Sequence, residues 1–202
     1  MRSWDERDAK EPAQPGFIPP NGGYESLHSY QKAPVVYDAT VHFCARFLEK
    51  RDRTYDQMVQ AARSGKQNNV EGSQISGTSK ELELKLTNVA RASLEELLKD
   101  YGDFLRVRGL APWPRDHRYT ARLRQLNQTP GANYETFRKG IEHPDPAICA
   151  NVIIGLIKLT CFLLDRQIAA LERAFIEEGG IRERMSEARR REKMKQKPRR
   201  EA

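Results

Sequence analysis

The sequence predicts an all-α protein, an antiparallel four-helix bundle with a short basic helical insert and a basic C-terminal extension. Three observations support this fold class. Apolar residues recur at steps of three and four in several long segments. Hydrophobic residues make up 38% and charged residues 31%, which suits amphipathic helices with solvated outer faces better than a compact sheet. Glycine and proline pairs separate the helical segments within 202 residues, a length that favours one domain with extensions.

The N-terminal part of the chain combines an arm with the first helix. Residues 1–23 are expected to be flexible, because they hold four of the eleven prolines and show no helical periodicity. The bundle is expected over residues 24–180, with a first helix from Gln31 or Pro34 to Lys50, since proline is tolerated only near a first turn. Two apolar stripes run along this helix, more than one neighbouring helix covers, so part of the surface is expected to face another subunit. The stripes are Val36, Thr40, Phe43 and Phe47, and Tyr37, Val41, Cys44 and Leu48.

The second helix is expected to begin at a capping box formed by Thr54 and Gln57. It should end near Glu71, with Gly72 as its C-terminal stop. Its inward side consists of small residues, which allow a neighbouring backbone to approach closely. These residues are Ala61, Ala62, Ser64 and Gly65.

The third helix is expected to begin at a second capping box, formed by Thr78 and Glu81, and to run to about Arg106. Its apolar positions make a seam suited to antiparallel packing. The seam consists of Leu86, Ala90, Ser93, Leu97, Tyr101 and Phe104.

An insert of about residues 106–144 follows the third helix. Residues 109–114 break the chain, residues 116–126 are able to form a short basic helix, and a turn or two of helix is expected over 134–141. The fourth long helix should then begin near Asp145 and Pro146 and end at the Gly179–Gly180 pair. Its apolar seam consists of Ile157, Cys161, Leu164, Ile168, Leu171 and Phe175.

Positive charge is concentrated in two segments of the chain. The net charge is +7, of which residues 106–124 contribute +5 and the tail, residues 181–202, contributes +6, so the remainder is mildly acidic. This distribution is typical of a protein that meets polyanions at particular places. The insert interleaves Trp113, His117 and Tyr119 with six arginines, which combines phosphate contacts with stacking surfaces. The alternative is a solvated helix and loop whose aromatic rings only cap the bundle. The arginines are Arg106, Arg108, Arg115, Arg118, Arg122 and Arg124.

The tail has almost no apolar residues and therefore no face to bury, so it is either a solvated extension or disordered until bound. Its cations indicate a second site for nucleic acid, and a purely solubilising role is the alternative. Neither basic segment suggests sequence-specific readout. The candidate binding residues of the tail are Arg189, Arg190, Arg191, Lys193, Lys195 and Lys197.

Residues 22–105 resemble the four-helix-bundle family that includes proteins encoded in bacterial ribosomal RNA intervening sequences. The matching words are DQM at 56–58, QAARSG at 60–65, Asn68, Glu71-Gly72 and LTNVARASLEEL at 86–97. The branch that the chain resembles is the four helix bundle suffix domain. A related member, the accessory variability determinant of diversity-generating retroelements, forms a basic pentameric barrel that binds RNA and a reverse transcriptase. The resemblance implies a pentamer, nucleic-acid contact and a reverse transcriptase or another nucleic-acid enzyme as partner.

Four polar residues in the resembling segment form a candidate structural motif: Arg63, Asn68, Glu71 and Arg91. An interhelical ion pair of Glu71 with Arg63 or Arg91 is expected, with hydrogen bonds from the Asn68 or Asn88 amide. Contact with a ligand or RNA is the alternative role for these residues.

No catalytic, metal or cofactor site is expected from the sequence. A bundle di-iron site needs Glu-x-x-His on two helices, and only Glu25 and His28 have that spacing. The three cysteines are widely spaced and no signal peptide precedes them, which indicates a reducing cytoplasm. The most apolar run, residues 151–164, is interrupted by Lys158 and is shorter than the roughly 20 residues of a membrane span, so no membrane is expected.

Two functions from different classes remain open. The first is a non-catalytic, homo-oligomeric nucleic-acid-binding protein, for RNA rather than sequence-specific DNA, that assists an RNA- or DNA-handling enzyme. The second is a structural oligomer or protein-interaction module whose tail only aids solubility. Salt dependence of binding to a generic RNA or duplex separates them, because phosphate contacts release counterions.

Overall fold

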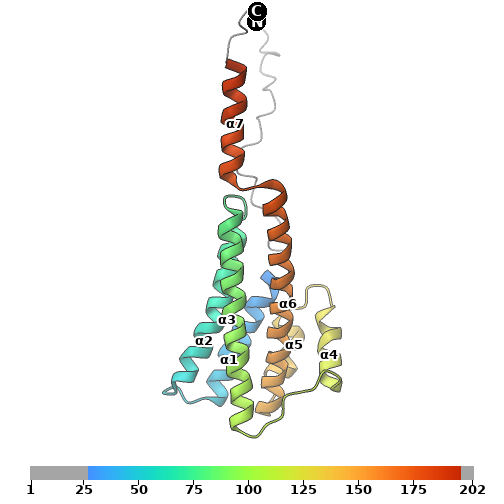
Figure 1. The fold of residues 1–202 in the computed structure, drawn as a ribbon. Helices are drawn as coiled ribbons and strands as arrows, with labels where there is room; N and C mark the ends of the chain where they lie inside the picture. The colour runs from blue at the N-terminus through green and yellow to red at the C-terminus, as the bar shows by residue number, and fades with distance from the viewer. Residues whose placement is uncertain (1–26, 197–202) are drawn as a thin grey trace, which may run out of the picture.

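The computed structural model describes residues 27–196, and this part of the chain is all-helical, as predicted (Figure 1). The predicted arm at residues 1–23 and the end of the predicted tail lie outside the described residues. Within the described range there are seven helices and no strand. The helices are α1 (His28–Phe47), α2 (Arg53–Gln74), α3 (Lys80–Val107), α4 (Arg118–Asn127), α5 (Tyr134–Ile141), α6 (Pro146–Glu178) and α7 (Ile181–Gln196).

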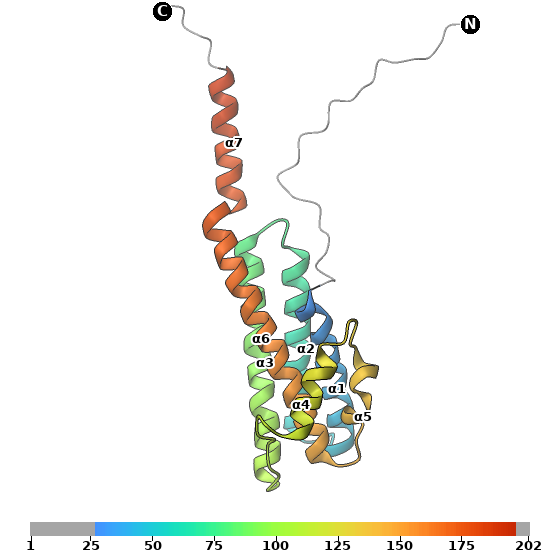
Figure 2. The ribbon, with the colours of Figure 1, turned by 90° about the vertical axis from the view of Figure 1, so that its right-hand side faces the viewer.

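Four long helices, α1, α2, α3 and α6, form what we call the helical body. Helix α1 packs against α2 and α6, and α3 packs against the same two helices. Helices α4 and α5 lie along one side of the body, where both pack on α6 and α5 also contacts α1 (Figure 2). Helix α7 extends past the end of α6, away from the body (Figure 1). The insert therefore connects α3 to α6 in the sequence and packs on the side of α6.

The predicted capping boxes of α2 and α3 are wrong, because stronger capping residues lie beside them. Asp52 caps α2, and its carboxylate accepts a 2.8 Å hydrogen bond from the Thr54 N–H. Ser79 caps α3, and its hydroxyl accepts a 3.2 Å hydrogen bond from the Leu82 N–H. Aspartate and serine are better N-caps than threonine, so the helices begin at these residues rather than at Thr54 and Thr78.

Two residues that the sequence places at helix ends lie inside helices instead. Helix α1 begins at His28, so Pro34 falls within it rather than in its first turn. Helix α2 continues to Gln74, so Gly72 does not end it. Gly72 is buried against α3, where a Cβ atom would lie 3.3 Å from the Cβ of Leu86. This glycine serves helix packing rather than termination.

The small residues of α2 bring it close to α3, as predicted. A Cβ atom on Gly65 would lie only 2.6 Å from Cδ2 of Leu94 on α3. The hydroxyl oxygens of Ser64 and Ser93 lie 2.9 Å apart across the same contact. Any larger residue at position 65 would push Leu94 out of the core.

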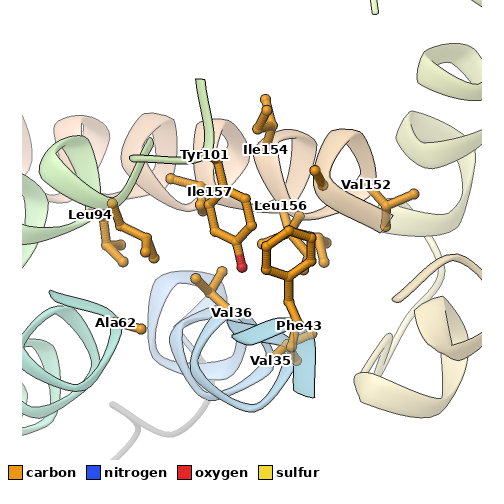
Figure 3. Close-up of a cluster of buried hydrophobic side chains, with 14 of the residues drawn as sticks. Val35, Val36, Phe43, Ala62, Leu94, Tyr101, Val152, Ile154, Leu156 and Ile157 are labelled. Atoms are coloured by element: carbon orange, nitrogen blue, oxygen red, sulfur yellow. The ribbon is translucent and has the colours of Figure 1, made fainter. Parts of the chain in front are cut away.

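The centre of the core is an aromatic cluster around Phe43 of α1. Its ring centroid lies 4.9 Å from that of Tyr101 and 4.8 Å from that of Phe104, both on α3. The Tyr101 hydroxyl donates a 3.2 Å hydrogen bond to Oγ1 of Thr40, so the one polar atom of the buried ring is satisfied. Figure 3 shows the Phe43 and Tyr101 side chains beside aliphatic ones from α6, among them Leu156. The core therefore joins α1, α3 and α6.

The second apolar stripe of α1 is largely covered within the chain. Lys66 of α2 places its Nζ atom 4.0 Å from the centroid of the Tyr37 ring. Tyr37 and Val41 also line a hollow together with Tyr134 of α5. Contacts with α2 and α5 therefore cover part of the apolar surface on α1, while Tyr37 and Val41 stay partly exposed beside the hollow. The expected subunit contact on this helix stays a prediction.

Helix α6 is the most apolar element, and its two halves differ. Ile157, Cys161 and Leu164 of the predicted seam are buried, whereas Phe175 is 38% exposed and its neighbour Ile176 is 81% exposed. By length and composition α6 is apolar enough to cross a membrane. However, 61% of its apolar 18-residue segment is buried inside the structure. A core helix of a soluble protein passes the same test, and the burial of this window favours a core helix.

The three cysteines are free and buried, an environment in which cysteine acts as a small hydrophobic residue. Burial raises the pKa of Cys44 and of Cys149 to about 12 and that of Cys161 to about 11. The Cys149 thiol donates a 2.7 Å hydrogen bond to the Ile141 carbonyl, which ties α6 to α5.

Candidate nucleic-acid interface

Asn151 of α6 fixes the loop that leads into the insert. Its side chain is 4% exposed, and Oδ1 accepts a 2.6 Å hydrogen bond from the Trp113 N–H. Its Nδ2 donates to the carbonyls of Ala111, at 3.1 Å, and Ala147, at 2.9 Å. One buried amide thus holds two backbone positions of a loop that otherwise runs over the surface.

Helix α4 is attached to α6 by one close contact. Leu123, the buried residue of α4, rests on Gly155 of α6. A Cβ atom on Gly155 would lie 2.2 Å from Cδ2 of Leu123, so only glycine leaves room for this leucine. With Leu123 turned inward, the remaining residues of this short helix face solvent or the neighbouring hollows.

The far end of the insert is anchored by two cations of α1. Lys32, 5% exposed, donates a 2.6 Å hydrogen bond from Nζ to the Ala132 carbonyl, and burial lowers its pKa. Arg46 donates to the carbonyls of Glu142, at 2.9 Å, and His143, at 3.4 Å. Helix α5 occupies 134–141 as predicted and is therefore held against α1 at both ends.

Three rings of the insert form an aromatic stack, namely Trp113, His117 and Tyr119. The Trp113 and His117 rings are nearly parallel, 19° apart, with centroids at 4.8 Å. The Tyr119 ring lies 5.2 Å from Trp113 and carries the Arg118 guanidinium at 4.6 Å from its centroid. The predicted interleaving of rings and arginines is thus a spatial cluster as well as a sequence pattern.

The six predicted arginines of the insert separate into two groups. Arg106 and Arg108 lie at the C-terminal end of α3, where Arg106 pairs with Asp103 and Arg108 lies over the Phe104 ring. The other four are exposed on α4 and the loop before it, and we call them the α4 arginines. The α4 arginines are Arg115, Arg118, Arg122 and Arg124.

A hollow lies on each side of α4. The first, of about 470 Å³, lies between α4, α5 and α6 and is lined by Trp113, Tyr119, Arg122 and Lys139 among others. The second, of about 660 Å³, lies between α4 and α6, and we call it the α4–α6 groove. Its lining residues are Arg115, Thr120, Leu123, Arg124, Asn127, Gln128, Gly155, Lys158, Leu159 and Phe162.

Sequence reasoning missed Asn151, Lys158 and Phe162 as candidate site residues. Lys158 stood out only as an interruption of an apolar run, and Phe162 is one turn further along the same face of α6. The sequence does contain a signal for this site, because a lysine and a phenylalanine four residues apart lie outside the apolar seam of the helix. The polar role of Asn151 has no sequence signal, because its partners lie about 40 residues away in the chain.

The predicted tail is helical to Gln196 and begins after a glycine kink. Gly179 has φ of 66°, a left-handed conformation that glycine adopts without strain, and the Gly180 N–H donates to Glu183. Two candidate cations have local ion pairs, Arg191 with Glu187 and Lys195 with Glu192. Arg189, Arg190 and Lys193 are exposed on the same helix, and Lys197 lies outside the described residues.

The predicted polar motif does not come together. Glu71 is exposed and accepts a hydrogen bond from Gln67, while Asn68 donates to Ser64 on its own helix. Arg63 is also exposed. Arg91 pairs with Asp165 of α6 and Glu95 of α3. The expected ion pair of Glu71 with Arg63 or Arg91 is therefore wrong: Arg63 and Glu71 are exposed on α2, and Arg91 faces α6.

Comparisons of the chain with protein-family models, curated proteins and solved structures find no match.

Proposed function

We propose that this chain is a non-catalytic nucleic-acid-binding protein that contacts RNA through the insert. The observation that carries the proposal is the set of α4 arginines, four exposed cations beside a stack of three rings. Arginines bind phosphates, and aromatic rings stack on bases of any sequence. Asn151 and Leu123 hold this surface on α6, so the cations and rings keep fixed positions relative to one another.

The scaffold that we propose is an antiparallel four-helix bundle. The contacts of α1 and α3 with both α2 and α6 support it, since each helix of the body then has two neighbours. In such a bundle the long connection between α3 and α6 carries the binding surface, and the body supplies the rigid support.

We further propose that the chain acts as a homo-oligomer beside a reverse transcriptase or another RNA- or DNA-handling enzyme in the cytoplasm. The resemblance described above implies five subunits and this kind of partner. In an oligomer several basic surfaces act together, so weak contacts from each chain add to substantial avidity.

The test measures the binding of the full chain to single-stranded RNA of arbitrary sequence. Fluorescence anisotropy gives the affinity at several salt concentrations. Affinity should fall with salt at a log–log slope of about 0.7 per phosphate neutralised. A variant with Arg118→Ala and Arg122→Ala should bind more weakly and with a shallower slope. The matched control is Arg53→Ala with Arg63→Ala, which removes the same charge from α2 instead of α4. Equal loss in both variants would mean that net charge, not this surface, drives binding.

A protein-interaction module is the second candidate, and one observation favours it. The first turn of α3 adjoins the end of α6, where Lys80 donates to the Ala174 carbonyl. Exposed apolar side chains gather at this end of the body. They are Leu82, Phe175, Ile176 and, on α7, Met185. A chain that oligomerises normally but shows no salt-dependent RNA binding would support this function instead.

A further inference from the structure

We propose that the α4–α6 groove binds an unpaired nucleotide of a single-stranded nucleic acid, with its base stacked on Phe162 and its phosphates held by Arg115 and Lys158. This inference rests on the proposed function and assigns the nucleotide a place in the structure. The groove is distinct from the aromatic stack of Trp113, because it opens on the other side of α4.

The charge of the groove matches a phosphate backbone. Three cations line it, Arg115, Arg124 and Lys158, and none of its lining residues, all within the described part of the chain, carries a negative charge. Arg124 donates a 2.9 Å hydrogen bond to the Arg115 carbonyl, which fixes the loop on which Arg115 lies. The three cations therefore surround one space rather than being spread over the surface.

The groove also offers a stacking surface. Phe162 is 55% exposed, an unusual environment for a phenylalanine in the buried part of α6. Leu159 and Gly155 lie on the same face of α6 as Phe162 and line the groove with it. Stacking of a base on an exposed aromatic ring is the interaction by which proteins bind single strands without sequence preference.

The volume suits one nucleotide rather than a duplex. At about 660 Å³ the space lies within the range of small-molecule sites. A base in a duplex is stacked on its neighbours and does not present its face to Phe162. Single strands should therefore bind in preference to duplexes at this position.

The experiment compares full-length variants by anisotropy with oligo(A), oligo(C) and oligo(U) RNA of about 12 nucleotides, with the DNA forms and with duplex RNA. Phe162→Ala should weaken single-strand binding by about 5- to 100-fold and duplex binding far less. Phe162→Tyr keeps the ring and should restore affinity. The control is Val89→Ala, which removes an exposed apolar side chain from α3, outside the groove, and should leave affinity unchanged.

The charge variants test the phosphate contacts. Lys158→Ala and Arg115→Ala should each lower the salt slope by about 0.7. The affinities of the wild type for RNA and for DNA need not be equal. If Phe162→Ala weakens both by the same factor, the contact with the sugar lies elsewhere and the base stacks on Phe162.

Two results overturn the inference and leave the proposed function intact. The first is RNA binding that is lost in the Arg118→Ala, Arg122→Ala variant but normal in Phe162→Ala, Lys158→Ala and Arg115→Ala. The second is a change of oligomeric state in Phe162→Ala, by light scattering, with unchanged affinity, which would make the groove a subunit contact. A wild-type chain with no salt-dependent binding would remove both proposals.

Discussion

Asn151 is the residue on which the position of the insert depends. It makes hydrogen bonds to Ala111 and Trp113 of the loop and to Ala147 of its own helix. Asn151→Ala should lower the free energy of unfolding by about 1–3 kcal/mol, since buried partners lose their hydrogen bonds. Urea denaturation measures this change. In a Trp4→Phe background, Trp113 emission should also shift to the red. The control Asn88→Ala removes an exposed amide from α3 and should change neither quantity.

Glu83 should make stability depend on pH. Its side chain is 6% exposed, and burial raises its pKa to about 7, against an ordinary value of 4.5, although Lys80 opposes the shift. Between these pH values the folded chain keeps a proton that the unfolded chain has released. Unfolding free energy should therefore fall as pH rises from about 4.5 to about 7, at up to about 1.4 kcal/mol per pH unit.

Glu83→Gln should remove this pH dependence, because glutamine is neutral throughout the range. Chemical denaturation at several pH values gives the slope for each variant. Glu172→Gln, at an exposed position on α6, is the control and should keep the slope of the wild type. A slope that persists in Glu83→Gln would assign the titration to another group.

Glu71 and Phe43 mark two extremes of burial. Glu71→Ala should change stability by less than about 0.5 kcal/mol, because its side chain is exposed and no ion pair is broken.

Phe43→Ala should cost about 3–5 kcal/mol, because its ring touches Phe47, Tyr101 and Phe104 in the centre of the core. Thermal denaturation of the two variants gives both values. A large loss in Glu71→Ala would mean that this carboxylate has a buried partner in the assembled protein.

At the scale of helices, the apolar periodicity and glycine breaks predicted most of the fold. The start of α6 at Pro146, the span of α5 and the break at Gly179 all agree with the structure. The helix starts of α2 and α3 did not, because several capping residues stand close together and only the folded chain shows which one reaches the free N–H groups. A helix cap depends on one residue among several neighbours of similar capping strength. Apolar periodicity is a more reliable signal because it depends on many residues.

The candidate site was predicted in composition but not in geometry. The basic, aromatic character of residues 106–124 is visible in the sequence, and the α4 arginines and the ring stack agree with it. The contribution of α6 was not visible, since Lys158 and Phe162 belong to a helix that reads as core. Residues distant in the chain meet only through packing, and periodicity carries no information on which helix faces an insert.

Helix α7 should be dispensable for folding. It has exposed cations and lies beyond the body, so deletion of residues 181–202 should leave the melting temperature unchanged (Figure 1). RNA affinity should fall and the salt slope should become shallower, because phosphate contacts are lost. Calorimetry and anisotropy on the same sample measure both effects. Undiminished affinity would leave the insert as the sole basic site.

For the whole molecule, the exposed apolar end of the body is where subunits should meet. Ile176 is 81% exposed, and burial of such a side chain contributes to association. Ile176→Asp should shift the mass measured by light scattering from an oligomer, for which five chains are implied, towards a single chain. Val107→Asp places the same charge at the opposite end of α3, where the side chain is 70% exposed, and should leave the mass unchanged. A monomeric wild type at micromolar concentration would contradict the prediction.

The buried cysteines make it possible to attach a dye at one chosen position of the protein. A maleimide reacts with thiolate, and all three native thiols are enclosed and have raised pKa values, so they should label slowly in the folded chain. A cysteine introduced at exposed Ser186 of α7 would then be the rapidly labelled thiol without any native cysteine being removed. A donor dye there and an acceptor on the RNA would report how far the tail lies from the bound strand.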